Sequence, residues 1–310
     1  MRLLKLVRYQ NLLMLAFMQL LFRYGFLKLQ NIPLALRDWQ YALLVLSTVL
    51  IAAAGYIINN IVDQETDAIN KPQNQIIGTK ITEATAYNIY VGLNCIGVAI
   101  GFYLANIIGK PNFAALFIII AATLYMYATT LKQMPVIGNL IVALLLAISV
   151  LTIGIFDLYP VITIENQKIM GSLFSVLLDY AIFAFMINFI REIVKDLEDV
   201  NGDHNQGMRT LPIVLGIKRT TILVFVMSIF PIFFLFVYIK NYLLTYNLFA
   251  TIIYAMLFVL APLLLFTVKI AIAKTQKDFH YLSTLLKGIL LFGILSILIL
   301  TLNIIYNASF

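Results

Sequence analysis

Long runs of apolar residues, separated by short polar segments, follow one another along the whole chain. A helix of about 20 apolar residues crosses the hydrocarbon core of a bilayer, and runs of this length recur throughout the sequence. They cover residues 11–29, 41–60, 86–109, 113–131, 137–159, 172–194, 220–239, 248–270 and 285–307. Because the runs are continuous rather than alternating, they favour helices over barrel strands. The pattern predicts an all-α polytopic membrane protein, a bundle of nine transmembrane helices.

The composition agrees with this prediction. Of the 310 residues, 62% are hydrophobic and only 11% are charged, which excludes a soluble domain of this length. The net charge of +7 would suggest nucleic acid as a partner of a soluble protein, but here we attribute it to cytoplasmic loops. The single cysteine, Cys95, is expected to be a small buried apolar residue. No low-complexity or Pro/Gly linker interrupts the chain, so we expect one domain over residues 1–310.

The distribution of cations predicts the orientation. With a cytoplasmic N-terminus, all 21 lysines and arginines fall on cytoplasmic segments except Arg23, Lys28, Arg37, Lys110, Lys168 and Lys240. Cytoplasmic loops of membrane proteins carry this excess of Lys and Arg. We therefore expect an N-terminus in the cytoplasm of a protein of the cell (inner) membrane.

Two short acidic clusters stand out against this apolar background, both on the predicted cytoplasmic side. Each repeats Asn or Asp at steps of three or four residues: Asn59, Asp63 and Asp67 in the first, and Asp196, Asp199 and Asp203 in the second. On a helix such steps place side chains on one face. Hard oxygen ligands repeated in two places suit Mg²⁺ bound to the phosphates of a substrate. We therefore predict that these six residues are catalytic and bind the metal.

The first cluster is either a solvated loop or the end of a helix. Asn59, Asp63 and Asp67 continue the register of the run 41–60, and no Gly or Pro follows before Pro72. We therefore expect them on the last turns of a helix.

Cations lie close to both clusters in the sequence. They are either salt-bridge partners of the carboxylates or groups that neutralise phosphate oxygens. Lys132, at the predicted cytoplasmic end of the run 113–131, is either such a phosphate ligand or a snorkelling lysine. The candidate diphosphate ligands are Lys71, Lys132, Arg191, Lys195, Arg209 and Tyr127.

These residues resemble a known family. The run from Asn59 to Pro72 resembles the first aspartate-rich motif of the UbiA superfamily of intramembrane prenyltransferases, and the run from Arg191 to Asp203, with Arg-Thr-Leu-Pro at 209–212, resembles the second. Leu-Lys at 131–132, followed by Gly-Asn at 138–139, resembles the stretch after that family's fourth helix. Two departures are visible: Asn60 stands where many members have Asp, and Lys71-Pro72 replaces the usual Arg-Pro. Lysine keeps the charge but loses the bidentate fork of arginine.

The resemblance implies a reaction. Members bind an isoprenyl diphosphate through Mg²⁺ held between the two motifs, ionise the allylic C–O bond, and pass the prenyl group to a lipophilic acceptor. The implied fold has a central cavity that opens to the cytoplasmic side, and membrane lipid surrounds it. The second motif looks most like that of the digeranylgeranylglyceryl phosphate synthase branch, which implies a geranylgeranyl donor and geranylgeranylglyceryl phosphate as acceptor. An aromatic acceptor, such as 4-hydroxybenzoate or a quinone precursor, is the alternative.

Two rival functions follow from the same residues. A CDP-alcohol phosphotransferase also carries spaced aspartates on a helix, but it expects an Ala-Arg pair upstream, and the run 51–56 has no arginine. A cation-coupled transporter would place its ionisable residues near the bilayer midplane, whereas these cluster at one face. His204 and His280 are expected to be solvated loop residues.

Overall fold

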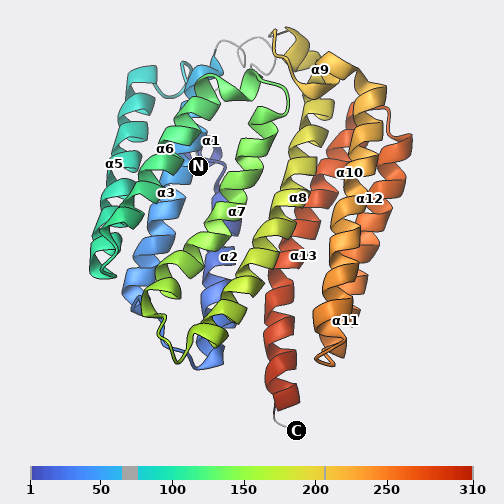
Figure 1. Cartoon of the computed structure of the whole chain (residues 1–310). Coiled ribbons are helices and arrows are strands. Elements are labelled where there is room, and N and C mark those ends of the chain that lie inside the picture. The colour runs from blue at the N-terminus through green and yellow to red at the C-terminus, as the bar shows by residue number, and fades with distance from the viewer. Residues whose placement is uncertain (1, 65–75, 206, 309–310) are drawn as a thin grey trace. The chain divides into compact units, whose positions relative to one another are not determined.

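The computed structural model describes residues 2–64, 76–205 and 207–308 of the chain (Figure 1). In this part of the chain the regular elements are helices, with one isolated bridge between Ile77 and Ile81. Nine of the described helices are long and apolar enough to cross a bilayer. Each coincides with one of the predicted runs, so the sequence prediction of nine membrane-spanning helices is confirmed for the described residues.

The elements follow one another in a simple order. They are α1 Arg2–Leu6, α2 Tyr9–Gly25, η1 Leu27–Gln30, α3 Asp38–Val62, α5 Glu83–Ile107, η3 Pro111–Phe113, α6 Ala114–Thr129, η4 Leu131–Gln133, α7 Ile137–Asp157, η5 Tyr159–Val161, α8 Gln167–Asn205, α9 Leu211–Leu215, α10 Ile217–Tyr238, α11 Phe249–Ala255, α12 Ala261–Ile272 and α13 Gln276–Ala308. Two π-helical turns, η6 Ile239–Leu243 and η7 Met256–Leu260, extend α10 and join α11 to α12.

The ends of α3 and α8 carry the acidic clusters. Helix α3 ends at Val62, so Asn59 lies in its last turn and Asp63 caps it with φ −84° and ψ 3°, while Asp67 lies outside the described residues. Helix α8 is 39 residues long and includes the whole second acidic cluster, whereas the apolar run ended at residue 194. At 1.5 Å per residue it measures about 58 Å, nearly twice the thickness of a bilayer's hydrocarbon core. Hydrophobicity marks only its lipid-spanning part.

The chain divides into two compact units. Unit 1 consists of Met1–Leu20, Pro33–Lys132 and Thr152–Ser172, and unit 2 consists of Leu21–Ile32, Gln133–Leu151 and Leu173–Phe310. In unit 1, α3 packs closely against α5 because glycine leaves room: a Cβ on Gly97 would lie 2.7 Å from Ile51 Cγ1. The Ser47 hydroxyl donates to the Gly97 carbonyl over 2.7 Å at the same crossing.

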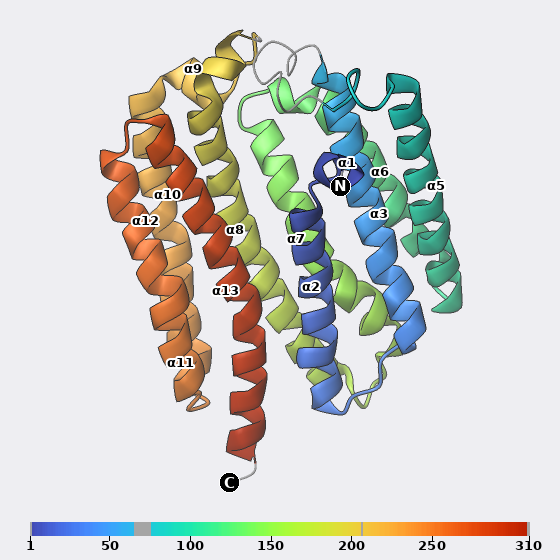
Figure 2. The ribbon, with the colours of Figure 1, turned by 180° about the vertical axis from the view of Figure 1, so that it is seen from behind.

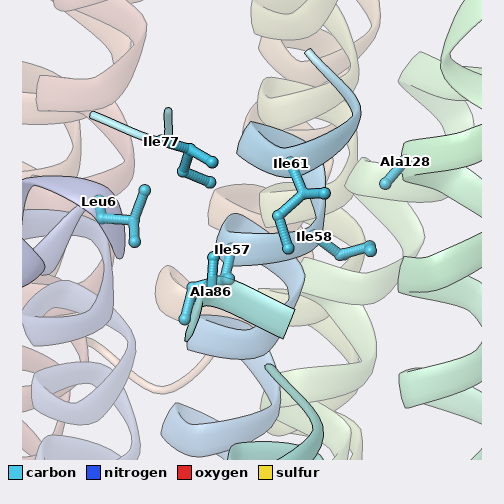
Figure 3. Packing of buried hydrophobic residues seen from close by; sticks show 7 residues of the cluster. All are labelled: Leu6, Ile57, Ile58, Ile61, Ile77, Ala86 and Ala128. Atoms are coloured by element: carbon cyan, nitrogen blue, oxygen red, sulfur yellow. The ribbon is translucent and has the colours of Figure 1, made fainter. Parts of the chain in front are cut away.

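A small hydrophobic cluster in unit 1 surrounds the C-terminal end of α3 (Figure 3). Figure 3 shows Leu6 and Ile77 on one side of α3 and Ala128 on the other. The buried members are Leu6, Ile57, Ile58, Ile61, Ile77, Ala86 and Ala128. Because burial of apolar side chains is the main stabilising term, this cluster fixes the ends of α1, α5 and α6 against the end of α3.

Unit 2 places α13 beside α8, as Figures 1 and 2 both show. Tyr180 on α8 and Ser296 on α13 are joined by a 2.7 Å hydrogen bond between their hydroxyls. Near its C-terminal end, α13 also meets α11, where Asn303 Oδ1 accepts the Thr251 amide over 3.1 Å. The hydrogen bonds hold α13 in register with its neighbours in this unit.

Three minor expectations are wrong. His204 lies in the last turn of α8, not in a loop, because that helix continues beyond the apolar run to Asn205. Cys95 is exposed on α5 rather than buried, because the buried side of α5 includes Gly97, which faces α3, and Gly101, which faces α6. His280 lies in the second turn of α13, not in a loop, because that helix begins at Gln276, before the apolar run does.

Candidate active site

The first part of the site lies in unit 1, where α3 ends. Asn59 and Asp63 are one helical turn apart, and the Asp63 amide still donates to the Asn59 carbonyl over 3.0 Å. Their side chains also meet: Asn59 Nδ2 donates to Asp63 Oδ2 over 2.9 Å. The amide therefore orients the carboxylate at the helix end, where backbone carbonyls already carry partial negative charge.

Lys132 completes this group. Its ammonium donates to Asp63 Oδ1 and, over 3.4 Å, to Asn59 Oδ1. Lys132 follows α6 by three residues, and Ala128 on α6 packs in the cluster around the end of α3, which places the lysine beside Asp63. The Lys132 side chain is 8% exposed and that of Asp63 is 21% exposed. The prediction placed Lys132 at a phosphate site, and the structure brings it to the first acidic cluster.

Asn60, the departure from the family motif, does not join this group. Its Nδ2 donates to the Tyr56 carbonyl over 2.7 Å and to the Leu6 carbonyl over 3.3 Å. The side chain thus ties α1 to α3. An aspartate could not donate these two hydrogen bonds, which gives a structural reason for the amide.

The second part of the site lies on α8 in unit 2. Asp196, Asp199 and Asp203 follow at steps of three and four on a regular helix, so they share one face, as predicted. Asn139, in the first turn of α7, donates to Asp196 Oδ2 over 2.8 Å and is 8% exposed. This charge-assisted hydrogen bond fixes the Asp196 carboxylate on the side of α8 that faces α7.

Cations of the second cluster share an acidic partner. Glu192 Oε1 accepts Lys195 Nζ over 2.5 Å and Arg191 Nη1 over 3.4 Å. Arg191 Nε also donates to the Ser283 carbonyl on α13 over 3.2 Å. Two helical turns beyond Arg191, Glu198 Oε1 lies 2.8 Å from His280 Nδ1. These contacts hold α8 against α13, on a different side from Asp196.

The structure describes two of the four remaining predicted site residues. Tyr127 is half-buried near the end of α6, and Arg209 is exposed, with its backbone amide donating to the Gln133 carbonyl over 3.2 Å. Asp67 and Lys71 lie outside the described residues.

The donors present suit a hard cation. Asn59, Asp63 and the α8 aspartates offer oxygen, which Mg²⁺ prefers. In residues 2–64, 76–205 and 207–308, no group of three or more His, Cys, Asp or Glu is close enough to form a metal cage. Mg²⁺ is usually bound through one or two carboxylates, with substrate phosphates and waters completing its octahedron, so the separate carboxylates fit this mode of binding.

Sequence reasoning missed two residues here. Asn139 stood in a stretch that resembles the family but was given no role, because its partner lies 57 residues away on another helix. Glu192 was not predicted because only Asn and Asp were considered as members of the clusters. Its position four residues before Asp196 was the available signal.

Comparison with known proteins agrees with the sequence motifs. The profile of the "UbiA prenyltransferase family" matches residues 20–280. The digeranylgeranylglyceryl phosphate synthase of Korarchaeum cryptofilum is 35% identical over 62% of this chain and 62% of its own length. That of Sulfolobus acidocaldarius is 36% identical over 58% of each. The matched stretches therefore span about six-tenths of these relatives.

Solved structures share the fold. A structure of a digeranylgeranylglyceryl phosphate synthase has a TM-score of 0.63 at 23% identity, covering 96% of this chain and 98% of that one. A UbiA homologue from Archaeoglobus fulgidus bound to GPP and Mg²⁺ has a TM-score of 0.60 at 15% identity, covering 96% and 99%. The nine apolar helices and the matched profile make this an integral membrane protein. The chain belongs to the UbiA prenyltransferase family.

Proposed function

We propose that the protein is a Mg²⁺-dependent intramembrane prenyltransferase. It moves a geranylgeranyl group from its diphosphate to a lipophilic acceptor, for which geranylgeranylglyceryl phosphate is the best candidate. The family match supports the reaction, and relatives that are named digeranylgeranylglyceryl phosphate synthase support this acceptor over an aromatic one. The observation that carries the proposal is the half-buried group of Lys132, Asp63 and Asn59 at the end of a membrane-spanning helix. Ionisable groups in such a place are costly and usually functional.

In this proposal both acidic clusters hold the metal and the donor's diphosphate. Asn59, Asp63 and Asp67 serve from unit 1, and Asp196, Asp199 and Asp203 serve from unit 2. The cations Lys71, Lys132, Arg191, Lys195 and Arg209, together with Tyr127, contact the diphosphate. We further propose that residues 1–310 act as one domain in this reaction.

The proposed reaction breaks one C–O bond and forms another. The allylic C–O bond of the donor breaks with its electron pair on the diphosphate, the acceptor hydroxyl forms the new C–O bond, and its proton passes to solvent. Bound Mg²⁺ would neutralise the negative charge that develops on the leaving diphosphate. Lys132 can turn from Asp63 to a phosphate oxygen, because the flexible stem of lysine carries a mobile point charge. Apolar helices around the site keep water from the allylic cation.

The proposed orientation follows from the charge distribution. The N-terminus and the active site face the cytoplasm, and the central cavity opens there. A fluorescent protein that folds only in the cytoplasm should fluoresce when it is fused to the N-terminus. Alkaline phosphatase, which is active only outside the cytoplasm, should be active when it is fused to the C-terminus. The opposite pair of results would reverse the orientation.

The function is tested with purified protein in lipid vesicles. Labelled geranylgeranyl diphosphate is offered with geranylgeranylglyceryl phosphate or with 4-hydroxybenzoate, and the lipid product is identified by mass spectrometry. We expect a digeranylgeranyl ether that forms with Mg²⁺ and disappears when the metal is chelated. Asp63→Ala should abolish the product, whereas Glu83→Ala, which removes an exposed carboxylate at the start of α5, should not. If only 4-hydroxybenzoate is prenylated, the proposed acceptor is wrong. If neither acceptor is prenylated, the proposed reaction is wrong.

A further inference from the structure

One ionisable side chain in unit 2 has no role in the site described so far. Lys287 lies on α13, eleven residues after the helix begins, and it is the only charged residue among the described residues 281–308. Its side chain is half-buried. A lysine in an apolar stretch of a membrane-spanning helix is a candidate functional residue, because its charge is expensive to keep in a low-dielectric environment.

The register of two helices places Lys287 level with Arg191. Glu198 on α8 lies 2.8 Å from His280 on α13, and the two helices run in opposite directions (Figure 2). Arg191 precedes Glu198 by seven residues, and Lys287 follows His280 by seven. Seven residues are two helical turns, about 10 Å along the axis. Arg191 therefore lies on the same side of α8 as Glu198, Lys287 lies on the same side of α13 as His280, and the two cations are at the same level.

Two further observations agree with this register. Arg191 Nε reaches the carbonyl of Ser283, one turn before Lys287. The Lys287 ammonium and the Arg191 guanidinium are close enough for their like charges to interact. Glu192 pairs with Arg191 and with Lys195, one turn further along α8, so this face of α8 carries two cations beside one carboxylate. Such a group is suited to an anion with more than one charge.

We propose that Lys287 and Arg191 form the binding site for the phosphate monoester of the acceptor. This inference rests on the proposed function and names the chemical class of the acceptor: an anionic alkyl glyceryl phosphate rather than an uncharged aromatic compound. Measured along the axis of α8, Arg191 lies about 8 Å before Asp196 and about 12 Å before Asp199. Arg191, with five donors, can serve both phosphates, whereas Lys287 serves the acceptor alone.

The experiment separates the two substrates kinetically. We compare Lys287→Gln, Lys287→Arg and the control Lys274→Gln, which removes an exposed lysine just before α13. Loss of one charge-assisted contact should raise the acceptor KM about tenfold in Lys287→Gln. The donor KM should stay within twofold, and Lys287→Arg and Lys274→Gln should resemble wild type. An unchanged acceptor KM, or an equal rise in the donor KM, would overturn the inference.

A binding measurement keeps the inference testable apart from turnover. A fluorescent alkyl glyceryl phosphate should bind the wild-type protein about tenfold more tightly than Lys287→Gln, while its dephosphorylated form should bind both equally. Equal binding of the phosphate form would refute this site even if prenyl transfer is confirmed. Conversely, tight binding of the probe without any prenylated product would contradict the proposed reaction and leave the phosphate site standing. If Lys287→Arg restores tight binding of the phosphate probe, the positive charge at position 287 is what binding requires, and a merely structural role of Lys287 is excluded.

Discussion

The pairing of Lys132 with Asp63 leads to a prediction about Lys132→Met, which removes the charge and keeps most of the apolar stem. Removing one partner of a fully buried ion pair costs about 3–5 kcal/mol. Asp63 is 21% exposed and still accepts the Asn59 amide over 2.9 Å, so water and that hydrogen bond offset part of the loss. We therefore expect a stability loss of about 1–2 kcal/mol, measured by thermal unfolding in detergent.

The effects on metal binding and turnover should have opposite signs. Without diphosphate, the Lys132 ammonium competes with a divalent ion for Asp63. Two unit charges 4 Å apart interact with about 4 kcal/mol at an effective dielectric constant of 20, and losing even a third of this repulsion tightens binding about tenfold. Turnover should nevertheless fall about 100-fold, because a cation that stabilises the leaving diphosphate is gone.

The assay therefore combines two measurements on one variant. Mn²⁺, used as a spectroscopic substitute for Mg²⁺, is titrated in the absence of diphosphate, and prenyl transfer is measured with saturating Mg²⁺. Lys132→Arg, which keeps the charge, serves as the control and should retain weak metal binding and part of the turnover. If Lys132→Met binds Mn²⁺ no more tightly than wild type, or keeps turnover within threefold, the assigned role of Lys132 is wrong.

Three further predictions concern other parts of the molecule. Asp199→Ala should reduce prenyl transfer by more than about 1,000-fold without reducing expression, because a metal ligand is lost; wild-type rates would remove this residue from the site. Asn139→Ala should lower kcat about tenfold and raise the Mg²⁺ concentration needed for half activation, because Asp196 loses the amide that orients it; an unchanged activation curve would contradict this. Gly101→Ala should lower stability by about 1–3 kcal/mol, because its Cβ would clash with Phe117 Cδ2 on α6. Gly92→Ala, with nothing within 4 Å of its Cβ, should leave stability unchanged, and equal unfolding temperatures of the two variants would refute the packing argument.

The length of the apolar runs was sufficient to predict the membrane-spanning helices, because every helix that crosses a bilayer must span the same hydrocarbon thickness. It could not predict the end of α8, since the part of a helix beyond the lipid has no apolar signature. The four-residue spacing of Asn59 and Asp63 was enough to predict that they lie together, because residues one helical turn apart are neighbours.

Contacts between distant segments were beyond sequence reasoning. Asn139 reaches Asp196, and Glu198 reaches His280, through packing that no short motif records. Lys132 was nominated from its charge and position, but its partner Asp63 became visible only in the fold. Lys287 was counted among the cytoplasmic cations, because α13 was expected to begin only two residues before it.

The uninterrupted course of α8 makes its length intolerant of change. Inserting or deleting one residue of α8 just before Arg191 would turn everything beyond that point by about 100° relative to the preceding part of the helix. The contacts of Asp196 with α7 and those of Arg191 and Glu198 with α13 would be lost together. Insertions should instead be accommodated in the turn between α12 and α13, where no shared helical phase has to be kept.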